Sequence, residues 1–283
     1  MSYYRVLGLK KEPFSTSPDP TFFYESAFHK TTLNRIQIAI KLKRGLSLIL
    51  GDVGIGKTTL SRRLFQLLKR DKKVFSHMIL NPIYETESEF LTALLRLFRI
   101  DQGPDPLPVV ESLDLIERYL FDKGVEDGQT VVLLIDEAQR LSPASLELLR
   151  ALLNYETNEH KLLQLILMGQ LELLPRIRGM NNFWDRISLR QALNPLDEAD
   201  VQAMIVFRLR QAGHASPESL FTAEAIRKIH HHTQGYPRRI AMLCHDALEQ
   251  LVMSSTSTEC VDEEIIHGLI KEGSQLLAQP VLN

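Results

Sequence analysis

Residues 48–60 read LILGDVGIGKTTL, an apolar run that leads through three glycines to a lysine and two threonines. The stretch from Gly51 to Thr58 matches G-x-x-x-x-G-K-[ST], a loop that wraps nucleotide phosphates between a strand and a helix. Glycine lets the backbone turn its N–H groups inward, and the following helix presents the positive end of its dipole to an anion. A chance glycine-rich turn is the alternative, but it does not explain the strand-like run before the loop and the helix after it.

The loop predicts a role for each of its residues. We expect Lys57 to reach the β- and γ-phosphate oxygens of ATP, and the Thr58 hydroxyl to ligate Mg²⁺. Thr59 is expected to contact the α-phosphate. The remaining residues are expected to line the nucleotide: Gly51, Asp52, Val53, Gly54, Ile55 and Gly56. ATP and Mg²⁺ are therefore the cofactors that this stretch implies.

A second strand-like run ends in two acids. In VVLLIDEAQRL, residues 131–141, Asp136 and Glu137 follow five apolar residues, where a buried parallel strand would end at the ligand crevice. Asp136 is expected to hold Mg²⁺ through water, and Glu137 to polarise the attacking water. The alternative, an acidic helix start with Ser142 as the next N-cap, explains one carboxylate but not the pair. The two acids predict ATP hydrolysis.

The composition limits the class and compartment of the protein. A chain of 283 residues with 44% hydrophobic content can bury a large core and divide into two domains. The formal charge of −2 gives no overall attraction to nucleic acid or to an anionic membrane. The amino terminus lacks a signal peptide's apolar core, and no segment reaches the ~18 apolar residues of a membrane span. We expect a cytoplasmic protein, with Cys244 and Cys260 as packing residues.

Strand-like and helix-like segments alternate as far as residue 193. The strand-like runs are 47–50, 74–80, 131–135, 163–168 and 187–193, and apolar residues at helical spacing lie between them. This alternation predicts an α/β fold with a mostly parallel sheet that is covered on both faces. After Pro195 only helices are expected, at 197–212, 222–232, 237–252 and 261–272. The predicted domains are 1–194, a nucleotide-binding core with an N-terminal extension, and 195–283, a helical domain.

Five segments in order resemble the AAA+ ATPases of the ExeA/GspA type and, more distantly, the transposition ATPases of the TniB/TnsC group. They are PFSTSPDPTFFYESAFHKTTL, GDVGIGKTTL, IDEAQRLSPASLELLRALLN, LILMGQLEL and TQGYPRRI. The resemblance runs from about residue 4 to about residue 270. It implies a P-loop NTPase of the AAA+ type, with a five-stranded αβα core, a small helical lid and an active site shared between neighbouring subunits.

The resemblance also implies site residues outside the two strand ends. Gln170, after the fourth strand, matches sensor 1, a polar side chain that helps to place the water; a solvated turn amide is the alternative. Arg238 matches sensor 2, a cation of the lid near the γ-phosphate, and Arg239 is the neighbouring alternative. Asn81, at the end of the second strand, is a candidate to hydrogen-bond Glu137 and hold it away from water.

The arginine finger is the side chain that one subunit places in its neighbour's site. The segment 173–193 offers four arginines, and we choose Arg186 with Arg190 second, because Arg186 lies just before the last core strand. A surface arginine paired with Asp185 is an equal alternative. The other two candidates are Arg176 and Arg178.

The resemblance implies a homo-oligomer, a ring or an arc that forms with ATP and remodels a partner. The implied task is assembly of a type II secretion or type IV pilus-like envelope machine, with a separate membrane or envelope-assembly protein as partner and a place at the inner face of the membrane. The alternatives are a DNA-associated regulator of the transposition type and a nucleotide-gated scaffold with incidental hydrolysis. Nucleic acid is not favoured, since the basic run at 62–73 lacks interleaved aromatics. The triplet His230–His232 reads as a solvated helix end rather than a metal site.

Overall fold

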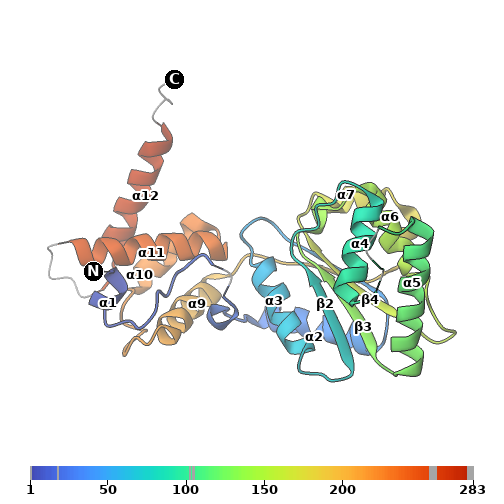
Figure 1. The fold of residues 1–283 in the computed structure, drawn as a ribbon. Coiled ribbons are helices and arrows are strands. Elements are labelled where there is room, and N and C mark those ends of the chain that lie inside the picture. Colours follow the sequence, from blue (N-terminus) through green and yellow to red (C-terminus); the bar gives the residue numbers. More distant parts are fainter. Residues whose placement is uncertain (1, 18, 102, 104–105, 255–259, 279–283) are drawn as a thin grey trace. The chain divides into compact units, whose positions relative to one another are not determined.

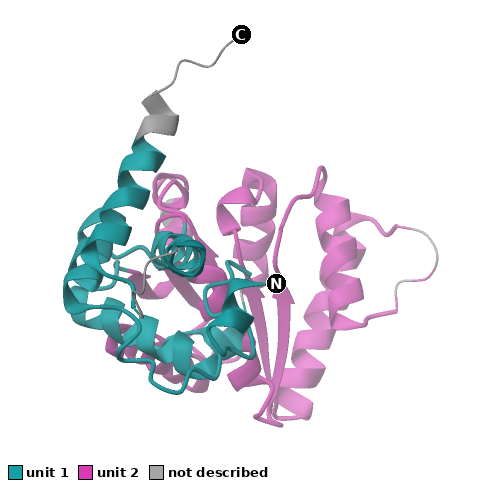
Figure 2. Cartoon of the chain, turned by 90° about the vertical axis from the view of Figure 1, so that its left-hand side faces the viewer, with its two compact units in different colours: residues 1–26, 54–56, 194–283 teal, residues 27–53, 57–193 magenta. Residues whose placement is uncertain are grey.

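The structure, a computed structural model, describes residues 2–17, 19–101, 103, 106–254 and 260–278. The chain forms two compact units, which Figure 2 distinguishes by colour. Unit 1 comprises residues 1–26, 54–56 and 194–283, and unit 2 comprises residues 27–53 and 57–193. The unit boundary at 193/194 lies next to the expected domain boundary, whereas the first 26 residues group with the C-terminal helices rather than with the sheet.

A five-stranded parallel sheet forms the centre of unit 2 (Figure 1). Its strands are β1 Leu46–Leu50, β2 Val74–Ile79, β3 Thr130–Ile135, β4 Leu163–Gly169 and β5 Ile187–Ala192. Their order in the sheet is β2-β3-β4-β1-β5, so β4 lies between β1 and β3. Because parallel strands end at one edge of the sheet, the residues that follow β1, β3 and β4 are neighbours there. The predicted strands and the α/β class are confirmed.

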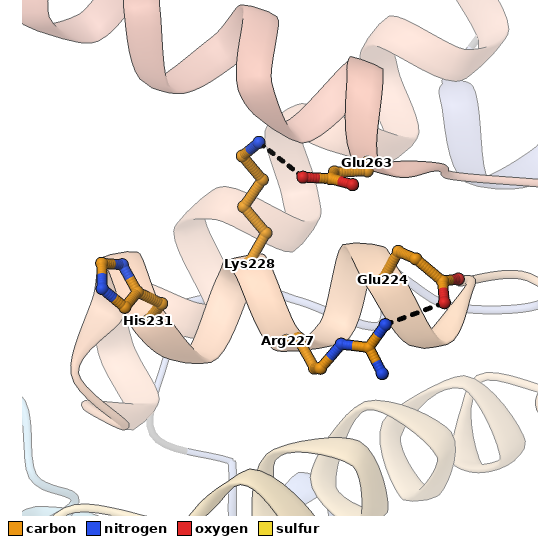
Figure 3. Close-up of a pocket in the computed structure, with 5 residues that line it drawn as sticks. All are labelled: Glu224, Arg227, Lys228, His231 and Glu263. Atoms are coloured by element: carbon orange, nitrogen blue, oxygen red, sulfur yellow. Dashed lines mark hydrogen bonds and ion pairs between the residues drawn. The ribbon is translucent and has the colours of Figure 1, made fainter.

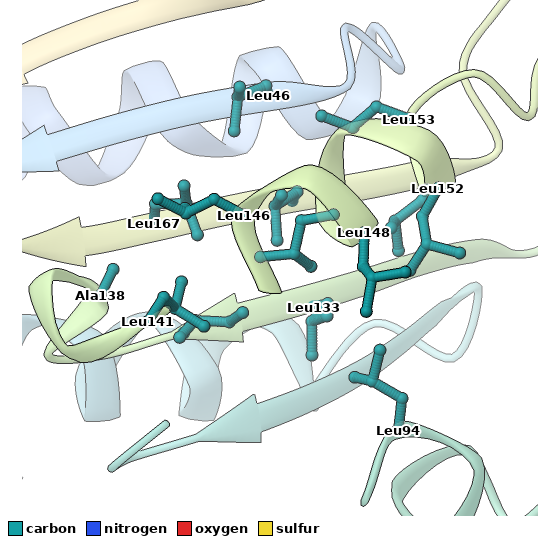
Figure 4. Close-up of a cluster of buried hydrophobic side chains, with 14 of the residues drawn as sticks. Leu46, Leu94, Leu133, Ala138, Leu141, Leu146, Leu148, Leu152, Leu153 and Leu167 are labelled. Carbon is teal, nitrogen blue, oxygen red and sulfur yellow. The ribbon is translucent and has the colours of Figure 1, made fainter. Parts of the chain in front are cut away.

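Helices cover both faces of the sheet. Those of unit 2 are α2 Ala27–Lys41, α3 Lys57–Leu68, α4 Glu87–Phe98, α5 Val109–Phe121, η2 Asp122–Glu126, η3 Ala138–Arg140, α6 Pro143–Leu152, α7 Leu173–Arg178 and α8 Asn181–Trp184. On one face, the leucines of α6 pack with those of the strands (Figure 4). On the other face, α3 contacts β2 and β4, and α2 contacts β5. The strand residues therefore read as continuous apolar runs, since alternate side chains enter opposite cores.

Short polar residues set where several helices begin. The Ser142 hydroxyl accepts a hydrogen bond from the Ser145 N–H at 3.0 Å, and Pro143 occupies the first turn of α6. Thr86 caps α4 in the same way, through the Glu89 N–H at 3.1 Å. Each cap satisfies a backbone donor that the first helical turn leaves without a partner. Ser142 is thus the N-cap that the alternative reading of the acid pair named, and α6 begins six residues after Glu137.

Unit 1 is helical. Its elements are α1 Tyr3–Val6, η1 Pro20–Phe22, α9 Glu198–Gln211, α10 Ala223–Thr233, α11 Pro237–Met253 and α12 Glu263–Ala278. Tyr3 and Phe14 are buried in one apolar cluster with residues of α9, α10 and α11, which explains why the N-terminal segment groups with these helices. The last four predicted helices are confirmed; three end within one residue of the expected position, and α12 continues six residues beyond residue 272. Among the described residues, no helix is both long enough and apolar enough to cross a bilayer.

One glycine of unit 1 is required by a close backbone contact. The Leu196 N–H donates to the Gly235 carbonyl oxygen at 2.9 Å, just before α9 begins. Gly235 has φ +72°, and a Cβ there would lie 2.0 Å from the Leu196 carbonyl oxygen. No other residue fits, so TQGYP is a structural joint between the start of α9 and the start of α11.

Candidate nucleotide site

The loop after β1 has the backbone that its glycines predict. Gly54 and Gly56 have φ +78° and +100°, in the region that side chains with a Cβ rarely adopt. Gly51 does not need this freedom; its N–H donates to the Gly169 carbonyl oxygen of β4 at 3.1 Å. The three glycines of the motif thus have different roles: Gly51 continues the hydrogen bonding of the sheet, and Gly54 and Gly56 allow the chain to turn.

Lys57, the first residue of α3, is 5% exposed. Its Nζ donates to the carbonyl oxygens of Gly51 at 3.0 Å and Asp52 at 2.9 Å. Burial lowers the pKa of the ammonium, against the charges of Glu137, Asp136 and Asp52, which raise it. The lysine is therefore held at the inner side of the loop, within electrostatic reach of both acids after β3.

Asp136 directly follows β3 and is 1% exposed. Its Oδ2 accepts from Ser61 Oγ at 3.3 Å, and its Oδ1 accepts from the Glu137 N–H at 3.1 Å. Burial raises the pKa of this carboxyl, with the Glu137 charge adding to it and hydrogen bonds from Thr58, Glu137 and Ser61 opposing it. A hydroxyl and a carboxylate are thus adjacent, and such oxygen ligands suit Mg²⁺.

Ser61 is a site residue that the sequence reasoning missed. It lies three residues after Thr58, so both face the same side of α3. Its hydroxyl also lies 2.9 Å from the Thr58 carbonyl oxygen, is buried with the rest of the residue and reaches Asp136. The i, i+3 spacing of Thr58 and Ser61 after Lys57 could have indicated that both hydroxyls lie on the same side of the helix.

Glu137 has the left-handed backbone conformation, with φ 53° and ψ 37°. Its Oε2 accepts a hydrogen bond from Gln139 Nε2 at 2.6 Å. The expected partner, Asn81, does otherwise: its Oδ1 accepts from Arg140 Nη1 at 3.0 Å. The expected hydrogen bond from the Asn81 amide to Glu137 is not found among the described residues, and the asparagine is joined through its oxygen to Arg140, in the same turn as Glu137. The amide that reaches Glu137 belongs to Gln139.

Gln139 links this turn to the end of β4. Its Oε1 accepts from the Gln170 N–H at 3.0 Å, and its own carbonyl oxygen accepts from Arg176 Nη1 at 2.7 Å. Arg176 Nη2 donates to the Leu141 carbonyl oxygen. The backbone of Gln170 therefore contacts the turn after β3, and the sensor role of its side chain stays a prediction. Sequence gave no sign of Gln139, because residues two apart normally point in different directions.

The four candidate arginines have different surroundings. Arg176 is bound to two backbone carbonyls, as described above. Arg190 Nη2 donates to the Trp184 carbonyl oxygen at 2.9 Å, and its guanidinium lies 4.0 Å from the centre of the Trp184 ring. Arg178 lies 5.2 Å from the same ring. Arg186 is half-buried, and its Nη1 has no hydrogen-bond acceptor among the described residues.

The two arginines of TQGYPRRI also differ. The Arg238 N–H donates to the Gly54 carbonyl oxygen at 3.2 Å, a contact within unit 1. A Cβ on Gly54 would approach the Arg238 Cβ to 3.2 Å, so the small residue allows this approach. Arg239 lies over the Tyr236 ring, with its guanidinium 4.7 Å from the ring centre. Of the two, Arg238 is the one whose backbone contacts Gly54.

The histidine triplet ends α10, where His231 lines a shallow polar pocket (Figure 3). The two cations of that pocket are each paired with an acid. Arg227 contacts Glu224 at 2.9 Å, and Lys228 contacts Glu263 at 2.8 Å. Because the pairs neutralise one another, this surface has no excess charge with which to attract an anion.

The parallel sheet, the glycine loop ending in Lys57 and Thr58, and the acid pair after β3 define a P-loop NTPase fold of the AAA+ class. A family model described as AAA domain matches residues 40–177. The chain is 39% identical to General secretion pathway protein A of Aeromonas hydrophila, over 249 residues that cover 87% of this chain and 44% of that protein. The chain belongs to the ExeA/GspA family of AAA+ proteins, and it spans less than half the length of this relative.

Solved structures agree on the fold. The ORC2 protein of Aeropyrum pernix, solved with ADPNP and ADP, superposes with a TM-score of 0.65 at 16% identity, over 96% of this chain and 75% of that one. Drosophila ORC bound to DNA gives a TM-score of 0.65 at 18% identity, over 98% of this chain and 67% of that one. At such low identity these likenesses establish a shared architecture, and the predicted AAA+ fold is confirmed.

Proposed function

We propose that this protein binds ATP with Mg²⁺ and hydrolyses it. The observation that carries the proposal is the placement of Lys57, Thr58, Asp136 and Glu137 at one edge of the sheet. Asp136 accepts a hydrogen bond from Thr58, and both acids act electrostatically on Lys57. A buried carboxylate is costly unless it is compensated, and the pKa of Asp136 stays raised by burial despite its hydrogen bonds, so a bound cation would stabilise the ionised form.

Each residue has a defined task in this proposal. The backbone from Gly51 to Gly56 surrounds the phosphates, with Asp52, Val53 and Ile55 between the glycines, and Lys57 neutralises the β- and γ-phosphate oxygens. Thr58 and Asp136 would hold Mg²⁺, which supplies charge neutralisation between the β- and γ-phosphates. Thr59, in the first turn of α3, contacts the α-phosphate. Glu137 accepts a proton from the water that attacks the γ-phosphate, and Gln170 helps to place that water.

Phosphate release and nucleotide binding test this proposal separately. The purified chain should bind a fluorescent ATP analogue and release phosphate only when Mg²⁺ is present. Lys57→Ala should lose binding, whereas Lys72→Ala, an exposed lysine of the same region, should match the unaltered protein. Equal binding and turnover in the Lys57→Ala and Lys72→Ala proteins would refute the proposal.

We further propose that the active form is a homo-oligomer. Arg186 is the proposed finger toward a neighbouring subunit, since Arg176 and Arg190 are engaged with backbone carbonyls and Arg178 lies on Trp184. Arg238 is the proposed γ-phosphate sensor, supported by its contact with Gly54. If so, ATP turnover per chain should rise with protein concentration, and Arg186→Ala should abolish that rise without weakening ATP binding. A rate per chain that stays constant would contradict the shared site.

The cellular task that we propose is assembly of a secretion or pilus-like envelope machine. It is supported by the 39% identity to a protein named for the general secretion pathway. The partner would be a separate membrane or envelope-assembly protein, and ATP-dependent co-purification with such a protein is the test. ATP-dependent, salt-sensitive DNA binding without any membrane partner would favour the DNA-associated regulator instead. Full cellular activity of Glu137→Gln would favour the nucleotide-gated scaffold.

A further inference from the structure

The Gln139 side chain joins the predicted base, Glu137, to Gln170, the residue that follows β4. Its Nε2 lies 2.6 Å from Glu137 Oε2, and its Oε1 lies 3.0 Å from the Gln170 backbone nitrogen. The contact to Gln170 spans 31 residues of sequence, so tertiary structure places it. One amide therefore contacts both the carboxylate that would polarise water and the segment proposed to sense the phosphate.

The orientation of this amide is fixed by chemistry. The Gln170 backbone N–H is a donor and must meet the amide oxygen, so the amide nitrogen necessarily faces the other way. What it faces is the Glu137 carboxylate, an acceptor. Both groups of the Gln139 amide are thus matched to their partners. In a flipped amide, the NH₂ group would face the Gln170 N–H, and the oxygen would face the Glu137 carboxylate.

The backbone around Gln139 is also held in place. Arg176 donates to the carbonyl oxygens of Gln139 and Leu141, on either side of Arg140. Gly169, the last residue of β4, packs directly against Gln139. A Cβ at this position would lie 3.2 Å from Gln139 Oε1 and 2.9 Å from the Leu173 side chain. The turn after β3 and the end of β4 therefore pack too closely to move independently.

We infer that Gln139 is a positioning residue for ATP hydrolysis: it orients the Glu137 carboxylate and couples that orientation to the segment that begins at Gln170. This inference rests on the proposed ATPase function and adds a residue to it. Gln139 donates to Oε2 of Glu137, which leaves Oε1 to accept from water. A shift of the Gln170 backbone moves the amide and, through it, the carboxylate.

The left-handed backbone at Glu137 makes this assistance necessary. A residue with a Cβ at φ 53° is held there only by its surroundings, and a glutamate side chain has three rotatable bonds with which to leave a productive position. A misplacement of a reacting group by about 1 Å can cost about 100-fold in rate. Loss of the Gln139 amide should therefore act on turnover rather than on nucleotide binding.

The test compares Gln139→Ala and Gln139→Met with the unaltered full chain. Methionine keeps the length of the side chain and removes both amide groups, so it guards against a simple packing defect. We expect kcat for ATP to fall about tenfold or more in both variants, while the dissociation constant of a fluorescent ATP analogue changes less than about twofold. Gln191→Ala, which removes a half-buried amide of β5 that accepts a hydrogen bond from Arg35, is the matched control and should keep the kcat of the unaltered protein.

Three results would overturn the inference. One is an unchanged or increased kcat in both variants. Another is a parallel loss of kcat and nucleotide affinity, accompanied by a lower melting temperature, since that pattern belongs to a merely structural residue. The third is an unaltered protein that binds ATP but releases no phosphate, which would refute the proposed function itself and not Gln139 alone.

Discussion

The loop after β1 and the turn after β3 flank the same strand, yet they hold their functional groups in different ways. In the loop, Lys57 bonds to carbonyl oxygens only six and five residues away. In the turn, Asp136 is contacted by Ser61, 75 residues away, and Gln139 and Leu141 by Arg176, 37 and 35 residues away. The contacts of Lys57 are local, so a short motif can encode them, whereas Asp136 and the backbone of the turn are held largely by residues that are distant in the sequence.

This contrast predicts which substitutions act on binding and which act on turnover or stability. The loop supplies the phosphate contacts, so damage there should appear as lost affinity. The turn supplies the groups proposed to act on water, so substitutions of these groups should lower turnover. Substitution of Arg176, which holds the backbone of the turn, should lower stability.

Lys57→Ala should have the largest effect. The buried ammonium is the main positive charge of the loop, and charge-assisted hydrogen bonds to phosphate contribute about 3 kcal/mol or more, which is about 100-fold or more in affinity. Isothermal titration with ATP and Mg²⁺ measures the loss. Because Lys57 Nζ also donates to the carbonyl oxygens of Gly51 and Asp52, the melting temperature should fall as well, and the affinities are compared well below the melting temperature of the variant.

Glu137→Gln should come next, with turnover reduced about 100-fold or more and ATP binding retained. Glutamine keeps the size of the side chain but cannot accept a proton from water. Single-turnover phosphate release, measured together with analogue binding, separates the two quantities. Substantial turnover in this variant would remove the hydrolytic role from the turn and erase the contrast with the loop.

Arg176→Ala tests the braces of the turn. The guanidinium makes two charge-assisted hydrogen bonds to carbonyl oxygens and is only partly exposed, so its removal should lower the free energy of unfolding by about 2 kcal/mol. Urea denaturation measures this difference. Arg190→Ala removes an exposed arginine from the same region and should cost less than about 1 kcal/mol. Equal losses in the free energy of unfolding would mean that Arg176 does not stabilise the turn more than an exposed arginine does.

Asp136→Asn should give the smallest effect, and its sign depends on pH. The pKa of Asp136 is raised above its ordinary value of 3.8, so the folded protein favours the protonated carboxyl. The stability that this proton provides is complete at acid pH and is lost as the pH rises through the folded-state pKa. Without nucleotide and in EDTA, the variant should therefore melt above the unaltered protein at pH 7, and the gap should close near pH 4.

A gap that is constant with pH would mean that burial of Asp136 is not what separates the two proteins. Asn154→Asp, on an exposed residue after α6, is a control that should leave the pH dependence of melting nearly unchanged.

The same difference between the loop and the turn decides which features could be predicted from the sequence. The loop, the two acids and all five strands were predictable, because apolar runs and a contiguous motif carry them. Ser61, Gln139 and Arg176 were not recognised in their roles, because each acts on a partner that the fold alone brings near. The Asn81 prediction was wrong for the same reason, since nothing in the sequence shows that Arg140 bonds to it. The finger and the sensors, which concern a neighbour or a ligand, remain predictions.

The contact between Gly235 and Leu196 has a consequence for the position of Arg238, the proposed sensor. The chain leaves β5 at Ala192 and enters the helical unit at Asn194, only two residues before Leu196. Arg238 lies three residues after Gly235. Since main-chain atoms make this contact, the start of α11 and the segment before α9 are held together within the helical unit by the backbone rather than by side chains. A bulkier residue at position 235 should separate the start of α11 from the segment before α9. Nucleotide affinity should remain unchanged, because the loop residues 51–58 are unaltered.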